Sequence, residues 1–290
     1  MGDGTGGESD PPAVDPAPGT GGDTEVETPE VEAQREAWLE LPAVRTDNAY
    51  PNAVERTLYY GDERNYTHYY DTSTYTSLWV AYPLESRHMG SETRPSKWYY
   101  NPEIEEEYQV DLCNSSYNDG YSRGHLIPNG SRDGIKEMQK QTFYVTNSVP
   151  QIQARFNGSV WNSLENALQA IAAGGETLYI VTGAAFNKVG ETEEITYTTA
   201  KDDTKSIPVA NYFYKVALKV STNAAGTITS ATTIGFWFEH REYVDDSYTN
   251  YAVSVDDIEA WTGFDFFVNL PDTIELQAEA NNNWSAFSSF

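Results

Sequence analysis

Five short segments rich in β-branched and aromatic residues, each bounded by turn formers, constrain the fold of this chain most strongly, because this composition is typical of β-strands. They are LWVAYPL (78–84), TFYVTN (142–147), TLYIVTG (177–183), NYFYKVALKV (211–220) and TTIGFWF (232–238). Between them, apolar residues recur every three or four positions from Val160 to Ile171, before Gly174 and Gly175, which predicts an amphipathic helix. A shorter helix is expected after Ser254. Strands with helices packed on them predict an α+β domain.

The first 42 residues differ in composition from the rest. They are rich in Gly, Pro and acidic residues and poor in aromatic and β-branched ones, so they cannot bury enough apolar surface to offset the entropy of ordering. We therefore expect a disordered acidic linker at 1–42 and a single domain at 43–290. Such a leader is typical of a tether that follows an export signal, so we also expect an exported protein, extracellular, periplasmic or tethered at the surface.

Charge is unevenly distributed along the chain. The formal net charge is −26, of which residues 1–41 contribute −10, with eleven acidic residues and one arginine. Between Arg123 and Asn157 the balance reverses, with five basic and two acidic residues, a local +3. The stretch YSRGHLIPNGSRDG, with Arg123, His125 and Arg132, therefore predicts a site for an anion inside an acidic protein.

Other classes of protein are excluded by what the sequence lacks. No run approaches the ~18 apolar residues that a membrane-spanning helix needs. The single cysteine, Cys113, cannot form an internal disulfide, and one cysteine with four scattered histidines offers no zinc-binding spacing.

Three motifs in the middle of the chain resemble, in order and spacing, the DNA/RNA non-specific endonucleases of the ββα-metal superfamily. They are YSRGHLIP (121–128), FYVTNSVPQ (143–151) and FNGSVWNSLE (156–165). The similarity extends upstream to WVAYPL and TRPSKWYYNPEI and downstream to VSVDDIEAWTGFDFFVNL, roughly residues 78–270. It implies a central, mainly antiparallel sheet with packed helices.

The resemblance implies a role for each motif residue. His125 would be the general base, because an imidazole can take a proton from water near neutral pH, with a midpoint near ~6.5 if its pKa is unshifted. Arg94 and Arg123 would hold the phosphate, since a guanidinium can donate two bonds to its oxygens. Asn147 matches a further polar residue of the site, whose task stays open.

The metal site is expected on the helix. Asn157, Trp161 and Glu165 stand at i, i+4 and i+8, which would place them on one helical face. The resemblance implies that Asn157 ligates Mg²⁺, with Mn²⁺ as a substitute, and that Glu165 orders the hydrated ion. Mg²⁺ accepts an amide oxygen and keeps most of its waters. Trp161 itself is expected in the core.

Some residues depart from the pattern or lack support from it. The acid that the family carries before Arg-Gly-His is Ser122 here, which puts local support of the site in question more than catalysis. Arg132 is expected to bind substrate. His68, His88 and His240 are expected to be structural or solvated.

The sequence therefore predicts a metal-dependent endonuclease that acts on DNA and RNA with little sequence preference. The alternative is an exported binding module for glycan or protein whose nuclease site is inactive, because the chain carries 21 tyrosines and seven tryptophans. Preference between DNA and RNA and the oligomeric state stay open, since contacts with phosphate and sugar carry no sequence code.

Overall fold

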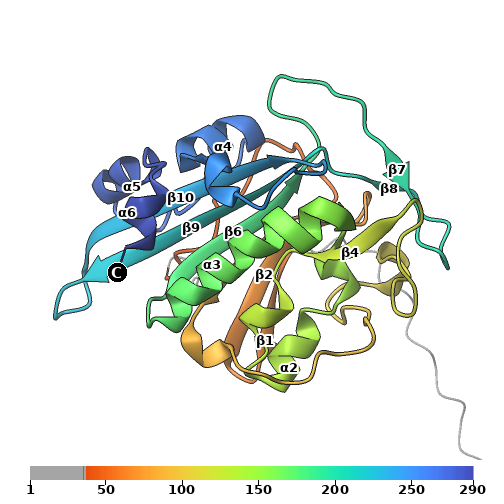
Figure 1. The fold of residues 1–290 in the computed structure, drawn as a ribbon, viewed down its shortest axis with the longest axis horizontal. Helices are drawn as coiled ribbons and strands as arrows, with labels where there is room; N and C mark the ends of the chain where they lie inside the picture. The colour runs from red at the N-terminus through yellow and green to blue at the C-terminus, as the bar shows by residue number, and fades with distance from the viewer. Residues whose placement is uncertain (1–34, 36, 290) are drawn as a thin grey trace, which may run out of the picture.

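The protein is described from a computed structural model, which describes residue 35 and residues 37–289. Its centre is a seven-stranded sheet in the order β1-β2-β3-β6-β9-β10-β11, in which every neighbouring pair is antiparallel (Figure 1). Two smaller sheets pair β4 with β5 and β7 with β8. The expected α+β architecture with a mainly antiparallel sheet is confirmed.

The strands are β1 (Ala53–Tyr60), β2 (Glu63–Asp71), β3 (Thr76–Leu84), β4 (Tyr121–His125), β5 (Ser148–Ile152), β6 (Leu178–Ala185), β7 (Tyr197–Thr198), β8 (Ile207–Pro208), β9 (Tyr212–Thr222), β10 (Ile228–Glu239) and β11 (Ala252–Val253). The α-helices are α2 (Lys136–Gln141), α3 (Asn162–Ala173), α4 (Val255–Thr262), α5 (Asp272–Glu279) and α6 (Trp284–Ser288). The short 3-10 helices are η1 (Ser86–His88), η2 (Glu106–Tyr108), η3 (Asn129–Ser131), η4 (Val145–Asn147) and η6 (Tyr248–Tyr251), and η5 (Gln153–Trp161) is an irregular helical segment.

Both faces of the sheet are apolar, because its central strands alternate buried side chains between two layers. One face packs against α3 and α6, and its core includes Phe213, Phe236 and Trp161. The other face packs against α4 and the segment 264–270, and its core includes Tyr214 and Trp237. In Figure 1, α3 runs in front of the sheet, with its N-terminal end beside β4. The sheet therefore separates two hydrophobic cores, one covered by α3 and α6 and the other by α4 and the segment 264–270.

Four of the five expected strands are confirmed as β3, β6, β9 and β10, and the expected helices are confirmed as α3 and α4. The segment 142–147 is not a strand. It makes one isolated bridge, between Tyr144 and Tyr99, and then forms η4, and the strand β5 begins only at Ser148. The α4 helix begins after a capping box between Ser254 and Asp257, which satisfies exposed backbone donors of its first turn.

The expected domain boundary after residue 42 is too late. Residues 1–34 and 36 lie outside the described residues, but Leu39 and Leu41 belong to the core beneath α4, and Glu40 is fully buried. The Glu40 carboxylate forms an ion pair with Arg64, whose guanidinium lies 4.0 Å from the centre of the Trp38 ring. The segment from Trp38 onward is therefore part of the domain, because it closes the core and compensates a buried arginine.

Truncation separates the acidic leader from this segment. We expect a chain starting at residue 35 to keep the melting temperature of the full chain. A chain starting at residue 42 should melt far lower, because it loses Leu39 and Leu41 from the core and leaves Arg64 without its carboxylate. The substitution Leu41→Ala alone should cost about 2–5 kcal/mol in the free energy of unfolding. Thermal unfolding followed by circular dichroism measures the melting temperatures, and urea unfolding measures the free energy of unfolding of Leu41→Ala. Equal stability of the two truncated chains would contradict this account.

Candidate active site

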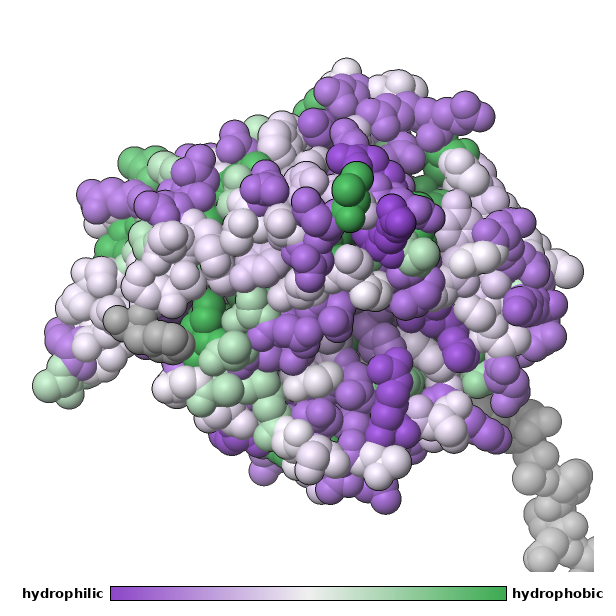
Figure 2. Space-filling model, viewed as in Figure 1, coloured by the Kyte–Doolittle hydropathy of each residue, from purple (hydrophilic) through white to green (hydrophobic). Residues whose placement is uncertain are grey.

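A cleft of about 390 Å³ opens on the α3 face of the sheet, between β4, the loop after it and the N-terminal end of α3. Figure 2 shows this face hollowed beside α3, with hydrophilic residues gathered around the hollow. The residues that line the cleft are Arg94, Arg123, His125, Pro128, Asn129, Gly130, Gln153, Asn157, Gly158, Asn162, Glu165, Asn166 and Gln169. Five of the seven residues predicted for the site from the sequence are in this set, and Asn147 and Arg132 are not.

The strand β4 carries Arg123 and His125 into the cleft, and it is held by antiparallel pairing with β5, in which His125 lies opposite Ser148. Gly124 stands between the two functional residues because there is no room for a side chain. A Cβ at this position would lie 2.1 Å from the side-chain oxygen of Gln151, a fully buried residue of β5. The Arg-Gly-His triplet therefore combines two side chains that face the cleft with close packing behind them.

His125 is held between aromatic rings. The centre of its imidazole lies 4.6 Å from that of Trp98 and 4.9 Å from that of Phe143. Its Nε2 is buried without a hydrogen-bond partner among the described residues, which leaves Nδ1 as the ring nitrogen open to the cleft. Burial, and then the charges of Arg94 and Arg123, lower the pKa of His125 to about 3. The imidazole of the free protein is thus neutral at physiological pH, and the unshifted midpoint near 6.5 does not apply.

Arg94 and Arg123 supply positive charge beside this neutral histidine. The Arg94 guanidinium lies 5.1 Å from the centre of the Phe143 ring, and that of Arg123 lies 5.4 Å from the centre of the Trp98 ring. Arg123 donates one hydrogen bond, from Nη1 to the backbone oxygen of Leu112. Within the described part of the chain, neither arginine forms an ion pair with a carboxylate. Two such guanidinium groups in one cleft suit the binding of a phosphate.

Arg132, which we expected to bind substrate, is instead a structural residue. It is fully buried, and its guanidinium donates to Asn65 Oδ1 and to the backbone oxygens of Asn65, Pro83 and Ser131. Burial lowers the pKa of Arg132 to about 10. With its donors bonded to the protein, Arg132 joins η3 to β2 and β3 and cannot reach a substrate.

Asn147, expected among the catalytic residues, also lies outside the cleft lining. Its side chain is fully buried, donates to the backbone oxygens of Ile127 and Thr142, and accepts from the backbone N–H of Ile127. These three hydrogen bonds fix the backbone two residues after His125. Asn147 is therefore placed to position the general base candidate and not to contact the reacting atoms.

Asn157 and Glu165 both line the cleft, but they do not share one regular helix. The segment η5 is interrupted at Ser159, which has φ −138° and ψ −106°, and α3 begins only at Asn162. The sequence Asn-Gly-Ser favours turns, and here it ends the helical geometry that the spacing predicted. Trp161 is fully buried in the core, as expected.

The Asn157 side chain is oriented by its amide nitrogen. This nitrogen donates to Ser122 Oγ at 3.1 Å and to Gln153 Oε1 at 3.3 Å, which leaves the amide oxygen as the atom available to a cation. Ser122 in turn donates to the backbone oxygen of Gln151. The residue that departs from the family pattern therefore supports Asn157 through a neutral hydroxyl in place of a carboxylate.

Glu165 lies in the first turn of α3, and its side chain is 11% exposed. Burial raises the pKa of its carboxyl, and the Lys215 ammonium, 3.7 Å from Glu165 Oε1, opposes this effect. Lys215 is fully buried, donates to Thr182 Oγ1 at 2.8 Å, and lies 4.4 Å from the centre of the Trp161 ring. The sequence analysis missed Lys215, although a lone lysine at an alternate position between Phe213 and Ala217 of an apolar strand is a signal for a buried charge.

The donor set of the cleft fits a hard, hydrated cation such as Mg²⁺. Asn157 offers one amide oxygen and Glu165 a carboxylate that can accept hydrogen bonds from bound water. Among the described residues, no group of three acidic, histidine or cysteine ligands converges in this cleft. An ion held here would thus keep most of its coordination sphere as water.

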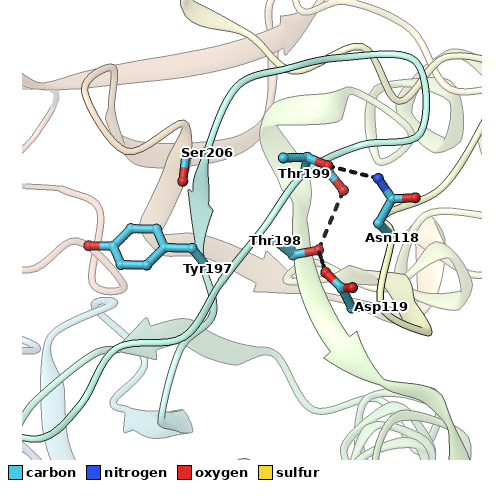
Figure 3. Close-up of a pocket in the computed structure, with 6 residues that line it drawn as sticks. All are labelled: Asn118, Asp119, Tyr197, Thr198, Thr199 and Ser206. Carbon is cyan, nitrogen blue, oxygen red and sulfur yellow. Dashed lines mark hydrogen bonds between the residues drawn. The ribbon is translucent and has the colours of Figure 1, made fainter.

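A second hollow lies between the residues that precede β4 in the sequence and the short β7–β8 sheet (Figure 3). Asn118 donates to Thr199 Oγ1, and the Thr198 hydroxyl donates to Asp119 Oδ2. Its lining residues are Asn118, Asp119, Tyr197, Thr198, Thr199 and Ser206. This hollow has no basic side chain in its lining and one carboxylate, so it does not suit a phosphate group.

Comparison with known proteins places this cleft in a family. A family model for the DNA/RNA non-specific endonucleases matches residues 48–273, and the chain therefore belongs to that family. A nuclease of Nostoc sp. is 27% identical over 212 residues, which cover 73% of this chain and 74% of that protein. The mitochondrial nuclease EXOG of Homo sapiens is 26% identical over 227 residues, which cover 74% of this chain and 60% of that protein. The chain thus belongs to a family of enzymes that are nucleases.

The fold agrees with this assignment. A crystal structure of the EndoG/EndoGI complex contains a chain that matches with a TM-score of 0.64 at 19% identity, covering 77% of this chain and 90% of that one. At this identity the likeness concerns the fold, which is the ββα-metal nuclease fold. No helix of the described residues is long and apolar enough to cross a membrane.

The enclosed position of His125 can be tested by NMR, because the chain has only four histidines. We expect the His125 imidazole of the metal-free protein to stay neutral down to about pH 4, since its pKa is lowered to about 3. The lowered pKa also makes folding stability depend on pH. The unfolded chain binds a proton at this histidine near pH 6.5 and the folded chain does not, so folding stability falls as the pH falls below 6.5.

The variant Trp98→Ala provides the contrast, because it removes one of the rings that enclose His125. Its His125 pKa should rise toward 6.5 as solvent reaches the imidazole, while the pKa of the buried His68, which makes no ring contact with Trp98 among the described residues, should stay low. Titration of ¹⁵N-labelled histidine side chains measures both values. A wild-type His125 that titrates near 6.5 would mean that the ring is not desolvated as described.

Proposed function

We propose that the protein is a metal-dependent endonuclease that hydrolyses phosphodiester bonds of DNA and RNA with little sequence specificity. One observation carries the proposal: a neutral imidazole lines the same cleft as Asn157, Glu165 and two arginines that form no ion pair with a carboxylate of the described residues. Hydrolysis of a phosphodiester needs a base for water, donors for the phosphate and a cation for the developing charge, and these residues can supply each of them.

Each side chain has one task in this proposal. Arg94 and Arg123 bind the non-bridging oxygens of the phosphate, and Nδ1 of His125 takes a proton from the attacking water. Asn157 would hold a hydrated Mg²⁺ through its amide oxygen, and Glu165 would accept hydrogen bonds from its water ligands. When bound, the cation supplies electrostatic stabilisation of the negative charge that builds up on the phosphate and the leaving oxygen.

Substrate binding itself prepares the base. In the free protein, burial and then the charges of Arg94 and Arg123 lower the pKa of His125, and the single negative charge of a bound phosphodiester would compensate part of the effect of the two arginines. The imidazole therefore becomes more basic once the phosphate is in place, which suits a group that must accept a proton in the complex.

The assay for this function is incubation of the full chain with supercoiled plasmid and with a folded RNA, with Mg²⁺, with Mn²⁺ and with a chelator. We expect internal cleavage of both substrates with either metal, loss of cleavage in the chelator, and products with 5′-phosphate and 3′-hydroxyl ends. Intact substrates in both metals would instead favour the alternative, a binding module with an inactive nuclease site.

The turnover number of the variant His125→Ala should be lower than that of the wild type by a factor of ~10² to 10⁴, the usual contribution of a general base. Its substrate affinity should change little. Its far-ultraviolet circular dichroism and its binding of Mg²⁺ should match the wild type. Arg132→Met is the matched structural variant. It should lower the melting temperature, while the turnover number of the folded protein should change little. Near-wild-type turnover in His125→Ala would remove the histidine from the mechanism.

The metal ligand is tested by a pair of variants at one position. Asn157→Ala should raise the Mg²⁺ concentration needed for half-maximal rate by about 10- to 100-fold, the loss found when supporting residues of other metal sites are changed. Asn157→Asp keeps an oxygen ligand and should retain most of the Mg²⁺ affinity. Ser122→Ala should shift the Mg²⁺ titration in the same direction by less, since it removes only the acceptor that orients Asn157. An unchanged titration in Asn157→Ala would contradict the assignment.

We further propose that the protein is exported, supported by the acidic leader rich in Gly and Pro. The names of the matched relatives do not decide between export and another location, because several of them, such as EXOG, are named as mitochondrial and others are not. Fractionation of cells of the source organism with an antibody against the domain tests it, and a protein found only in the cytoplasm would contradict it.

A further inference from the structure

A cluster of three carboxylates lies on the face of the sheet opposite the catalytic cleft. Asp256 and Glu259 come from α4, and Glu279 is the last residue of α5. One carboxylate oxygen from each lies within 4.8 Å of the other two. Both helices pack on β10 and lie near each other at the β9–β10 end of the sheet in Figure 1. No residue of the catalytic cleft belongs to this cluster.

Glu279 distinguishes this cluster from ordinary surface acids. The residue is only 5% exposed, and its Oε1 is buried without a hydrogen-bond partner among the described residues. A buried, unpaired carboxylate costs several kcal/mol unless a cation or a proton compensates it. Its place at the C-terminal end of α5 adds to that cost, because the helix dipole there disfavours negative charge.

The surroundings of Glu279 add negative charge. The four charged groups that act on it most strongly are all carboxylates, namely those of Glu259, Glu275, Asp256 and Asp265. Burial and these neighbours raise the pKa of Glu279 to about 9, and burial raises that of Glu259 to about 7. Among the described residues, the charged side chains that act most strongly on Glu259 and Glu279 are thus all negative, and none of them compensates the charge of the cluster.

We propose that Asp256, Glu259 and Glu279 bind a Ca²⁺ ion that joins α4 to α5 and stabilises the fold. Ca²⁺ takes six to eight oxygen ligands at ~2.3–2.6 Å, so oxygens on opposite sides of one ion lie up to ~5 Å apart. The three carboxylate oxygens fall within that span, and three carboxylates suit Ca²⁺ better than Mg²⁺, which gives up its waters reluctantly and is usually bound through one or two carboxylates. The exposed Asp256 leaves the remaining ligand positions to water and gives the ion access from solvent.

The ion would act on stability and not on catalysis. The α4 helix closes the core layer that contains Trp237 and the segment 264–270, and α5 is tied to β10 by a hydrogen bond from Thr233 Oγ1 to the backbone oxygen of Ala278. A ligand that binds only the folded chain stabilises it in proportion to the logarithm of its concentration. Ca²⁺ would therefore raise the melting temperature without being required for the proposed hydrolysis.

The experiment is thermal unfolding of the full chain after chelation and dialysis, with Ca²⁺, with Mg²⁺ and with no divalent ion. At 100 times the dissociation constant, Ca²⁺ should raise the melting temperature by about 5–10 °C, and Mg²⁺ at the same concentration by clearly less. Calorimetric titration of the Asn157→Ala variant with CaCl₂ should still show one bound ion, because the catalytic cleft is excluded in that variant.

Two variants locate the effect. Glu279→Gln should fold with an unchanged or higher melting temperature in the absence of metal, since it removes a buried charge, and should lose the Ca²⁺-induced rise and the calorimetric signal. Glu275→Gln, which changes a neighbouring acid outside the cluster, should keep most of both. If the wild type showed no Ca²⁺-induced rise, or if Glu279→Gln kept all of it, the proposal would be wrong and Glu279 would be neutralised by a proton. Nuclease activity of Glu279→Gln in Mg²⁺ is measured separately, so the outcome does not depend on the proposed function.

Discussion

The buried ion pair of Lys215 and Glu165 is the interaction on which the proposed catalytic cleft depends. Lys215 projects from the middle of β9 into an otherwise apolar layer, and Glu165 approaches it from α3. A charge in this position must be paired, because an isolated ammonium in the interior is strongly destabilised. The pair therefore fixes where the first turn of α3 lies on the sheet, and with it the floor of the cleft.

From this floor the rest of the site is built by neutral hydrogen bonds. Asn147 holds the backbone that follows His125, and Ser122 orients Asn157 from the neighbouring strand position. A carboxylate in place of Ser122 would add a charge beside Asn157 and strengthen that hydrogen bond. The serine keeps the geometry with less charge, so the affinity for the cation must come to a larger extent from Asn157 and from Glu165.

Most of the site could be predicted from sequence, because the motifs are local. Arg123 and His125 share one strand, and the amphipathic pattern around Trp161 places Glu165 on the helix that covers the sheet. The failures come from contacts between residues far apart in the sequence. Arg132 looks like an exposed turn residue until Asn65 and Pro83 enclose it. The helix expected through Asn157 ends because Gly158 and Ser159 favour a turn, which outweighs the spacing.

The fold shows the same division between local and distant information. Strands β6, β9 and β10 are apolar enough to be recognised, whereas β1 and β2 carry many polar residues and are strands because β2 pairs with β3 and β1 pairs with β2. Likewise, Leu39 and Leu41 lie at the end of an acidic leader, and only the core beneath α4 shows that they belong to the domain. Composition averages over a window, so it cannot locate a boundary where a few residues pack into a distant layer.

The two faces of the sheet differ in how their charges are arranged, and this difference lets a chain of net charge −26 carry the proposed phosphate site. On the α3 face, Arg94 and Arg123 form no ion pair with any carboxylate that the structure describes, and the one acid in the lining of their cleft, Glu165, is paired with Lys215. On the opposite face, Asp256 and Glu259 of α4 and Glu279 of α5 bring one carboxylate oxygen each within 4.8 Å of the other two. At physiological ionic strength charges are screened over ~8 Å, so the distant acids reduce the rate of encounter but not the strength of contacts inside the cleft. The sheet thus keeps the acidic cluster of α4 and α5 apart from the two arginines of the cleft.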